Sequence, residues 1–240
     1  MDTKKVNFTD YQITLEEVME QFDVSGREMY EDIVDELMED ASVYVQPAGF
    51  WREVGITSVS EEIVKLENEE FFSRYLAERL NGVEKAYAFV VTIAEELWQH
   101  RLAMSDALEQ YLFDAIMKTS LNRAFEKTAE EIVINLPDKA GLFMDNPGHI
   151  SGVNGNNSWK LADQKQFLSL LQNTNDQNFS IRIDARDHFE NSYSLSGIIY
   201  AKGIETANCT LCPKSECAHR KSAFDGKALI RRLHESAGSK

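Results

Sequence analysis

Apolar residues recur at helical spacing through most of the first half of the chain. Thr14 followed by Glu17 forms a capping-box pattern, which predicts the start of a short helix. Residues 26–41 carry apolar side chains at every fourth position, which predicts an amphipathic helix with an acidic outer face. A further helix is predicted over residues 71–80, and Gly82 marks its end because glycine commonly follows a helix C-terminus.

Two longer patterns follow in the middle of the chain. Residues 86–93 are apolar throughout and rich in residues that favour strands, which predicts a buried central strand. Residues 105–133 carry the longest helical pattern, with one broad apolar face. Residues 50–56 are predicted to be extended as well.

The segment after Pro137 has a different residue pattern, with shorter predicted elements. Residues 161–171 predict a short helix, and residues 181–185 and 197–200 predict two paired strands. Since helices and strands intermix without regular βαβ alternation, the predicted fold class is α+β. We expect one domain, with a helical N-terminal part over 1–80, an α+β core with the cysteines over 81–225, and a C-terminal tail over 226–240.

Composition and charge exclude several classes of protein. The 240 residues carry 40 Asp and Glu against 25 Lys and Arg, a formal net charge of −15. This balance argues against a duplex nucleic-acid binder and against docking on an anionic membrane, because both need a basic face. There is no apolar run long enough to span a bilayer, and no apolar segment follows the N-terminal lysines, so a cytoplasmic protein is expected.

The strongest chemical motif is a cysteine cluster near the end of the chain. Cys209, Cys212 and Cys217, with His219, form a C-x2-C-x4-C-x-H string. An odd number of clustered cysteines in a reducing compartment indicates a metal or redox site more than a disulfide framework. Thiolates are soft ligands, which favours an iron–sulfur cluster, with [4Fe-4S] preferred, or a zinc ion completed by His219. Three incidental thiols are the remaining alternative.

Two further segments are candidates for ligand binding. Asn146, Pro147, Gly148 and His149 open a Gly- and Asn-rich loop over residues 145–158 that ends near Trp159. Loops of that length often serve a function, although a solvated loop anchored by a core tryptophan is the simpler alternative. Ser194 and Ser196 precede an apolar strand, where their hydroxyls either line a pocket or bond the local backbone. The sequence contains no catalytic motif, so no catalytic residue is assigned.

The order and spacing of several segments resemble a known family. The resemblance rests on Asn146-Pro147-Gly148, Trp159-Lys160-Leu161 with Gln164, Ser194-Leu195-Ser196-Gly197-Ile198, and upstream Ala86 to Ile93 and Tyr111 to Ile116. Together they resemble the reactivation (S-adenosylmethionine-binding) domain of cobalamin-dependent methionine synthase. The likeness is to its stand-alone form in anaerobic bacteria, which often ends in a cysteine cluster.

The resemblance implies a fold and a role. It implies a twisted antiparallel sheet flanked by helices, with Asn146, Pro147, Gly148, His149, Trp159, Ser194 and Ser196 as cofactor-binding residues and Cys209, Cys212 and Cys217 as metal ligands. The implied role is an accessory protein that supports reductive reactivation of a corrinoid protein or a cobalamin-dependent methionine synthase, with cobalamin carried by that partner. The alternative is a non-catalytic interaction module with a structural zinc.

The sequence departs from the family pattern where S-adenosylmethionine would bind. Met144 and His149 stand where the family has an arginine and a tyrosine, and Asn191 replaces a proline. A helix glutamate of the family aligns loosely with Asn122. Since methionine cannot replace the bidentate contact of an arginine with a carboxylate, we expect weak S-adenosylmethionine binding.

Overall fold

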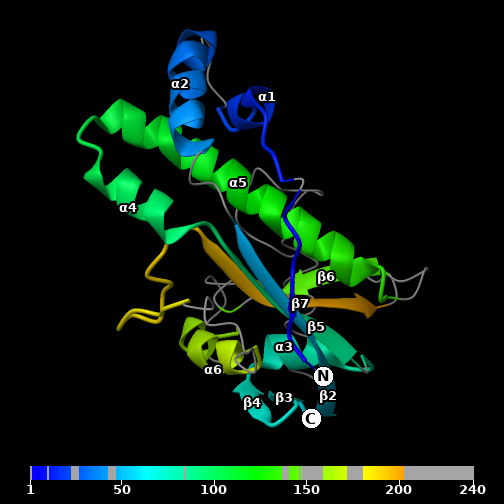
Figure 1. The fold of residues 1–240 in the computed structure, drawn as a ribbon. Coiled ribbons are helices and arrows are strands. Elements are labelled where there is room, and N and C mark those ends of the chain that lie inside the picture. Colours follow the sequence, from blue (N-terminus) through cyan, green and yellow to red (C-terminus); the bar gives the residue numbers. More distant parts are fainter. Residues whose placement is uncertain are drawn as a thin grey trace, which may run out of the picture.

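A seven-stranded antiparallel sheet forms the centre of the molecule (Figure 1). The computed structural model describes residues 2–9, 11–22, 27–42, 47–83, 85–136, 141–145, 147, 159–171 and 181–202. The strands are β1 (Lys4–Lys5), β2 (Ala48–Val59), β3 (Ile63–Leu66), β4 (Glu69–Phe72), β5 (Lys85–Thr92), β6 (Gly141–Asp145) and β7 (Ser194–Lys202). Their order is β4-β3-β2-β5-β7-β6, with β1 paired to β2.

Helices cover both faces and one end of this sheet, so the predicted α+β class is confirmed. The α-helices are α1 (Leu15–Met19), α2 (Glu31–Ser42), α3 (Arg74–Leu80), α4 (Glu95–Ala103), α5 (Ala107–Val133) and α6 (Gln164–Ser169). Two 3-10 turns, η1 (Arg27–Tyr30) and η2 (Leu161–Asp163), lead into α2 and α6. None of the helices in the described ranges is both long and apolar enough to cross a membrane.

Local capping interactions explain where several helices begin. The capping box predicted at Thr14 and Glu17 is present and opens α1. The side chain of Asp106 accepts hydrogen bonds from the first backbone amides of α5, and Ser73 caps α3 in the same way. Gly82, with a φ of 77°, follows α3 and ends it as predicted.

Strand β5 supplies both faces of the core because its side chains alternate. Ala86, Ala88 and Val90 face the layer that holds α3 and α6. The intervening residues Tyr87, Phe89 and Val91 face α5, which crosses the opposite face of the sheet (Figure 1). Because both faces are covered, the strand is apolar along nearly its whole length, which is the pattern that predicted it.

A separate apolar cluster lies beyond the end of the sheet. The helices α1, α2 and α4 pack there against the first half of α5, around residues such as Val34, Phe113 and Ile116. Figure 1 shows this helical end extending away from the strands.

One predicted helix begins later than expected, and one predicted strand pairing is wrong. Phe71 and Phe72 lie in strand β4, so the helix predicted over 71–80 begins only after Ser73. Residues 181–185 do not pair with β7, because Ile183 makes only an isolated bridge with Phe189 while β7 lies between β5 and β6. The alternating pattern of residues 181–185 was too short to identify its partner.

Gly49 allows the N-terminal segment to pack closely against β2. A Cβ atom at Gly49 would lie 3.0 Å from Phe8 Cζ and from Val6 Cγ2, and 3.1 Å from Thr128 Oγ1. We therefore expect Gly49→Ala to lower the free energy of unfolding by about 1–3 kcal/mol, measured by urea denaturation. Gly55→Ala is the matched control, because its Cβ would meet nothing nearer than 3.8 Å. Equal stabilities of the two variants would contradict this packing.

Candidate functional site

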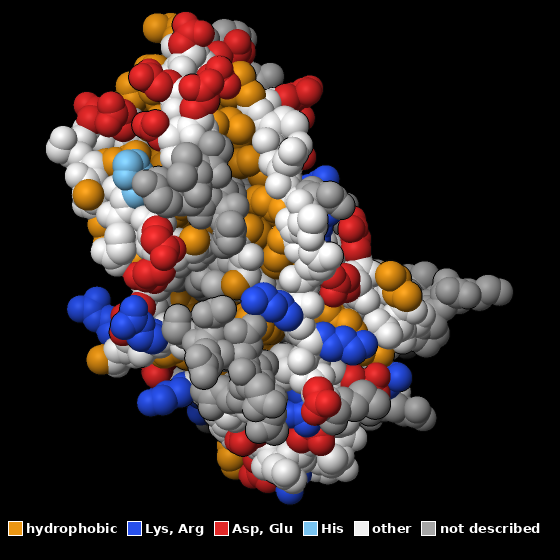
Figure 2. Space-filling view, viewed as in Figure 1, with side chains coloured by type: hydrophobic (Ala, Val, Ile, Leu, Met, Phe, Trp, Pro, Cys, Tyr) orange, Lys and Arg blue, Asp and Glu red, His pale blue; other side chains and the backbone are white. Residues whose placement is uncertain are grey.

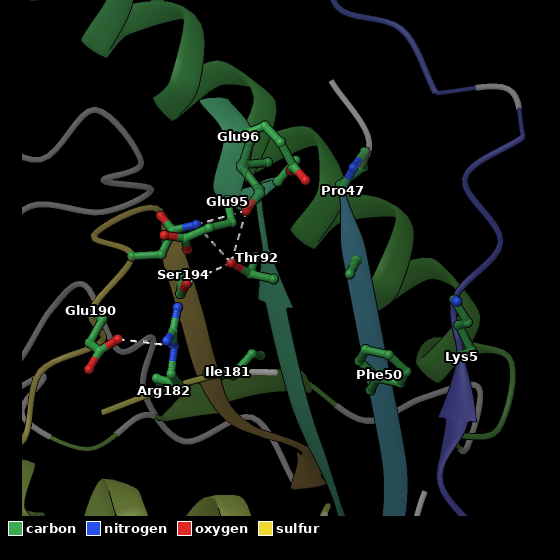
Figure 3. Close-up of a pocket in the computed structure, with 14 residues that line it drawn as sticks. Lys5, Pro47, Phe50, Thr92, Glu95, Glu96, Ile181, Arg182, Glu190 and Ser194 are labelled. Atoms are coloured by element: carbon green, nitrogen blue, oxygen red, sulfur yellow. Dashed lines mark hydrogen bonds and ion pairs between the residues drawn. The ribbon is translucent and has the colours of Figure 1, made fainter. Parts of the chain in front are cut away.

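A cleft of about 410 Å³ opens at the carboxyl end of β5 (Figure 3). Three neighbouring strands meet there in register, with Ala48 of β2 beside Thr92 of β5 and Thr92 beside Ser194 of β7. The N-terminus of α4 and the segment before β7 complete the walls. The lining residues are Lys5, Pro47, Ala48, Phe50, Thr92, Ile93, Ala94, Glu95, Glu96, Ile181, Arg182, Glu190, Asn191 and Ser194.

Hydroxyl and amide groups are ordered at the base of the cleft. Thr92 Oγ1 donates to the Ile93 carbonyl at 3.2 Å and lies 2.7 Å from Ser194 Oγ. Because a hydroxyl carries one proton, Ser194 must donate to Thr92 in this arrangement. The lone pairs of Ser194 Oγ are therefore oriented by the protein and can accept a hydrogen bond from a ligand.

Asn191 connects the two segments that form the wall. Its Nδ2 donates to the Ile93 carbonyl at 2.8 Å, and its Oδ1 accepts from the Tyr193 amide at 2.9 Å. The Ile93 amide in turn donates to the Tyr193 carbonyl at 3.0 Å. These bonds hold the residue after the carboxyl end of β5 against the segment before β7, which gives the cleft a preformed shape.

The charged groups around the cleft are of both signs. Three glutamates, Glu95, Glu96 and Glu190, line it with Lys5 and Arg182. Arg182 Nε lies 3.1 Å from Glu190 Oε2, and both side chains are largely exposed, so this ion pair is screened by water. Figure 3 shows Arg182 and Glu190 on one side of the cleft and Glu95 and Glu96 above its base. The lining can therefore contact both a cationic and an anionic group of one ligand.

A half-buried ion-pair cluster lies directly behind this wall. Tyr193 donates a short hydrogen bond to Asp114 of α5, and Arg101 of α4 binds the same carboxylate through two nitrogens at 2.8 and 3.1 Å. Burial raises the pKa of Asp114, but the hydrogen bonds from Arg101 and Tyr193 outweigh it and leave that pKa below its usual value. Burial and the bond to Asp114 raise the pKa of Tyr193. The cluster thereby fixes Tyr193, the residue directly before Ser194, to the helices α4 and α5.

Replacing Asp114 by Ala is expected to lower the free energy of unfolding by about 2–3 kcal/mol at pH 7, because Arg101 and Tyr193 lose their common acceptor. The lowered pKa of Asp114 means that its contribution is complete above a pH of about 4 and is lost as the pH falls through the lower folded value. The stabilities of wild type and variant should therefore converge in acid.

The control for Asp114→Ala is Glu126→Ala, on the same helix. Glu126 pairs with Arg123 at 3.2 Å, but its side chain is 58% exposed, so we expect a loss below about 1 kcal/mol. Urea denaturation at pH 7 and pH 3 measures both effects. Similar losses in the two variants would contradict a special role of the Asp114 cluster.

The structure brings some of the predicted binding residues together. Ser194 lines the cleft, and Ser196 follows it on the same face of β7, beside Val90. Ser196 is 2% exposed, and its Oγ has no hydrogen-bond partner in the described part of the chain. An unpartnered buried hydroxyl costs about 1–3 kcal/mol. Ser196 therefore has free hydrogen-bonding capacity on the face of the sheet that carries the cleft.

Trp159 is a core residue of the same layer. It is buried, with its ring 5.9 Å from that of Phe71 and 5.3 Å from that of Phe167, both in edge contact. Its Nε1 has no hydrogen-bond partner among the described residues. Pro147 is buried in a turn, while Asn146, Gly148 and His149 lie outside the described residues.

The three cysteines and His219 also lie outside the described residues. Within the described ranges, no group of three or more His, Cys, Asp or Glu residues is placed to hold a metal ion.

Sequence reasoning missed most of the cleft. Thr92, Glu95 and Arg182 were not identified, and Asn191 was noted only as a departure from the family pattern. One available signal was the change from apolar to polar residues where the buried strand ends at Thr92. Met144 packs instead with the cluster on the α5 face, opposite the layer of α3 and α6, because it lies beside Ile199.

Comparison with solved structures gives matches for this chain. No family model and no curated protein matches this sequence. Among solved structures, the chain is similar to the MetH reactivation domain bound to AdoHcy, with a TM-score of 0.50 and 12% sequence identity. The match covers 100% of this chain and 91% of that one. This chain has the fold of the MetH reactivation domain. The expectation of a twisted antiparallel sheet flanked by helices is thereby confirmed.

Proposed function

We propose that this protein is an accessory protein of a cobalamin-dependent methyltransferase and supports the reductive reactivation of its corrinoid. The observation that carries this proposal is the similarity of the whole chain to the MetH reactivation domain. The preformed cleft at the end of β5 supports it further, because that domain was solved with AdoHcy bound and a cleft of about 410 Å³ has the size of a small-molecule site. The partner is a corrinoid protein or a cobalamin-dependent methionine synthase.

The test is the rate at which Co(II) cobalamin on the partner is reduced and remethylated. An activator can change that chemistry only if it binds the Co(II) state of the partner differently from the other states. We expect anaerobic association with the cobalamin-loaded partner and a faster Co(II) to Co(I) step when this chain is present. Equal rates with and without the chain would contradict the proposal.

We further propose that Cys209, Cys212 and Cys217 hold an iron–sulfur cluster, preferably [4Fe-4S]. The donor set supports this assignment, because three thiolates within nine residues suit a soft metal centre and leave one iron open to another ligand. Such a cluster would supply or accept one electron. Protein purified without air should be brown and contain iron and acid-labile sulfide. A colourless protein with one zinc ion would instead support the interaction module with a structural zinc.

S-adenosylmethionine is expected to bind weakly at the cleft. The loss of one charge-assisted contact to a buried carboxylate costs on the order of 2–5 kcal/mol, or roughly 30- to several-thousand-fold in affinity. Isothermal titration calorimetry at ordinary concentrations should therefore show no saturable binding. Tight binding would contradict this prediction, and Arg182→Gln would then test whether this cation of the cleft replaces the missing arginine.

A further inference from the structure

The first turns of α5 expose apolar side chains to solvent. Leu108 is 41% exposed and Tyr111 is 53% exposed. Residues three apart lie on the same face of a helix, so these two side chains form one apolar surface. The ring of Tyr111 lies 5.6 Å from that of Phe22, a buried residue just after α1, so this surface lies beside the end of α1.

Acidic residues surround this apolar surface. Residues 11–42, which include α1 and α2, contain eleven Asp and Glu against one Arg. Asp106 and Glu109 add two exposed carboxylates at the start of α5. Figure 2 shows acidic side chains gathered over the helical end of the molecule, with hydrophobic side chains between them. We call α1, α2 and the first two turns of α5 the acidic end. An apolar surface with an acidic rim fits a basic, amphipathic segment.

The chain itself contains a segment with this chemistry. Residues 219–240 contain six Lys and Arg against two Asp and Glu, although the whole chain has a net charge of −15. Within them, Leu229, Ile230 and Leu233 are spaced as one apolar face of a helix, with Arg231 and Arg232 between them. We propose that residues 227–233 bind the acidic end of the same molecule, with these leucines and the isoleucine on Leu108 and Tyr111.

The connecting chain is long enough for this contact. Strand β7 and helix α4 both begin at the cleft, and each has nine residues. The strand is therefore roughly 30 Å long and the helix roughly 14 Å long. These two lengths bound the path that the connection must cover, from the end of β7 back past the cleft and along α4 to the acidic end. The 24 residues between Lys202 and Lys227 can span roughly 80 Å when extended. A tether of this kind gives a local concentration near the millimolar range, so even a weak site is occupied.

One consequence concerns the cysteine string, which lies within this connection. If residues 227–233 bind the acidic end, the segment between Lys202 and Lys227 is held at both of its ends. The cysteine string is part of that segment, so its ends are restrained as well. This inference does not depend on the proposed function, because it rests only on the charge and the apolar surfaces of the chain.

Hydrogen exchange of the full-length protein tests the proposal. We expect backbone amides of residues 227–233 to exchange at least about tenfold more slowly than in an unstructured peptide of the same sequence. The double variant Leu108→Gln and Tyr111→Gln should remove this protection, and 0.5 M NaCl should reduce it because exposed charges are then screened. A carbodiimide cross-link between Lys227 and a carboxylate of the acidic end should be lost in the same variant.

The matched control is Ile134→Gln, which replaces another exposed apolar residue at the opposite end of α5. It should leave the protection of residues 227–233 unchanged. Fast exchange of these amides in the wild-type protein would overturn the proposal. Protection that survives in the double variant would overturn it as well, and so would protection that increases with protein concentration, because the occupant would then be a second copy.

Discussion

Replacing Trp159 by Ala is expected to lower the free energy of unfolding by about 3–5 kcal/mol. Trp159 is 2% exposed and packs edge-on against Phe71 of β4 and Phe167 of α6, so its loss leaves a cavity between the sheet and α6. The neighbouring aromatic rings are held by separate elements and cannot close around the cavity without moving them. Urea denaturation followed by far-UV circular dichroism measures this effect.

Trp159→Phe separates packing from hydrogen bonding at the same position. Because Trp159 Nε1 has no partner among the described residues, phenylalanine loses volume but no hydrogen bond within this part of the chain. We expect less than half of the destabilisation of Trp159→Ala. If Trp159 also binds a ligand, as the family resemblance implies, Trp159→Phe should slow corrinoid reduction while the protein stays folded. An unchanged rate would limit Trp159 to its role in the core.

Replacing Cys212 by Ala is expected to abolish metal loading. Cys212 is the middle thiolate of the three, so its removal leaves a pair separated by seven residues, which cannot form the same site. The domain itself should remain folded, because all three proposed ligands lie within one stretch of nine residues and do not connect distant elements. Metal and sulfide content, with the circular dichroism spectrum, measure the two outcomes.

Ser215→Ala is the control for Cys212→Ala, because it alters the same stretch without removing a thiolate. It should keep the full metal content. Unchanged metal content in Cys212→Ala would exclude the cysteine cluster as the metal site. Unfolding of that variant would show that the metal supports the whole domain.

The sequence by itself predicted the elements whose side-chain pattern is set locally. The run from Ala86 to Ile93 predicted β5, because a strand covered on both faces must be apolar at nearly every position. The long apolar face of residues 105–133 predicted α5, and the capping box at Thr14 placed the start of α1. The order of several short motifs also indicated the fold, which the structure and its similarity to the MetH reactivation domain confirm.

The cleft and its supporting contacts were decided by the tertiary structure alone. Thr92 lies about a hundred residues before Asn191 and Ser194 in the sequence. The three residues meet only because β7 pairs with β5 in one particular register. A shift of one residue would turn Ser194 and Ser196 to the opposite face. The ion-pair cluster of Arg101, Asp114 and Tyr193 likewise joins two helices and the segment before β7. Periodicity reports which face of an element is buried, but not which distant element covers it.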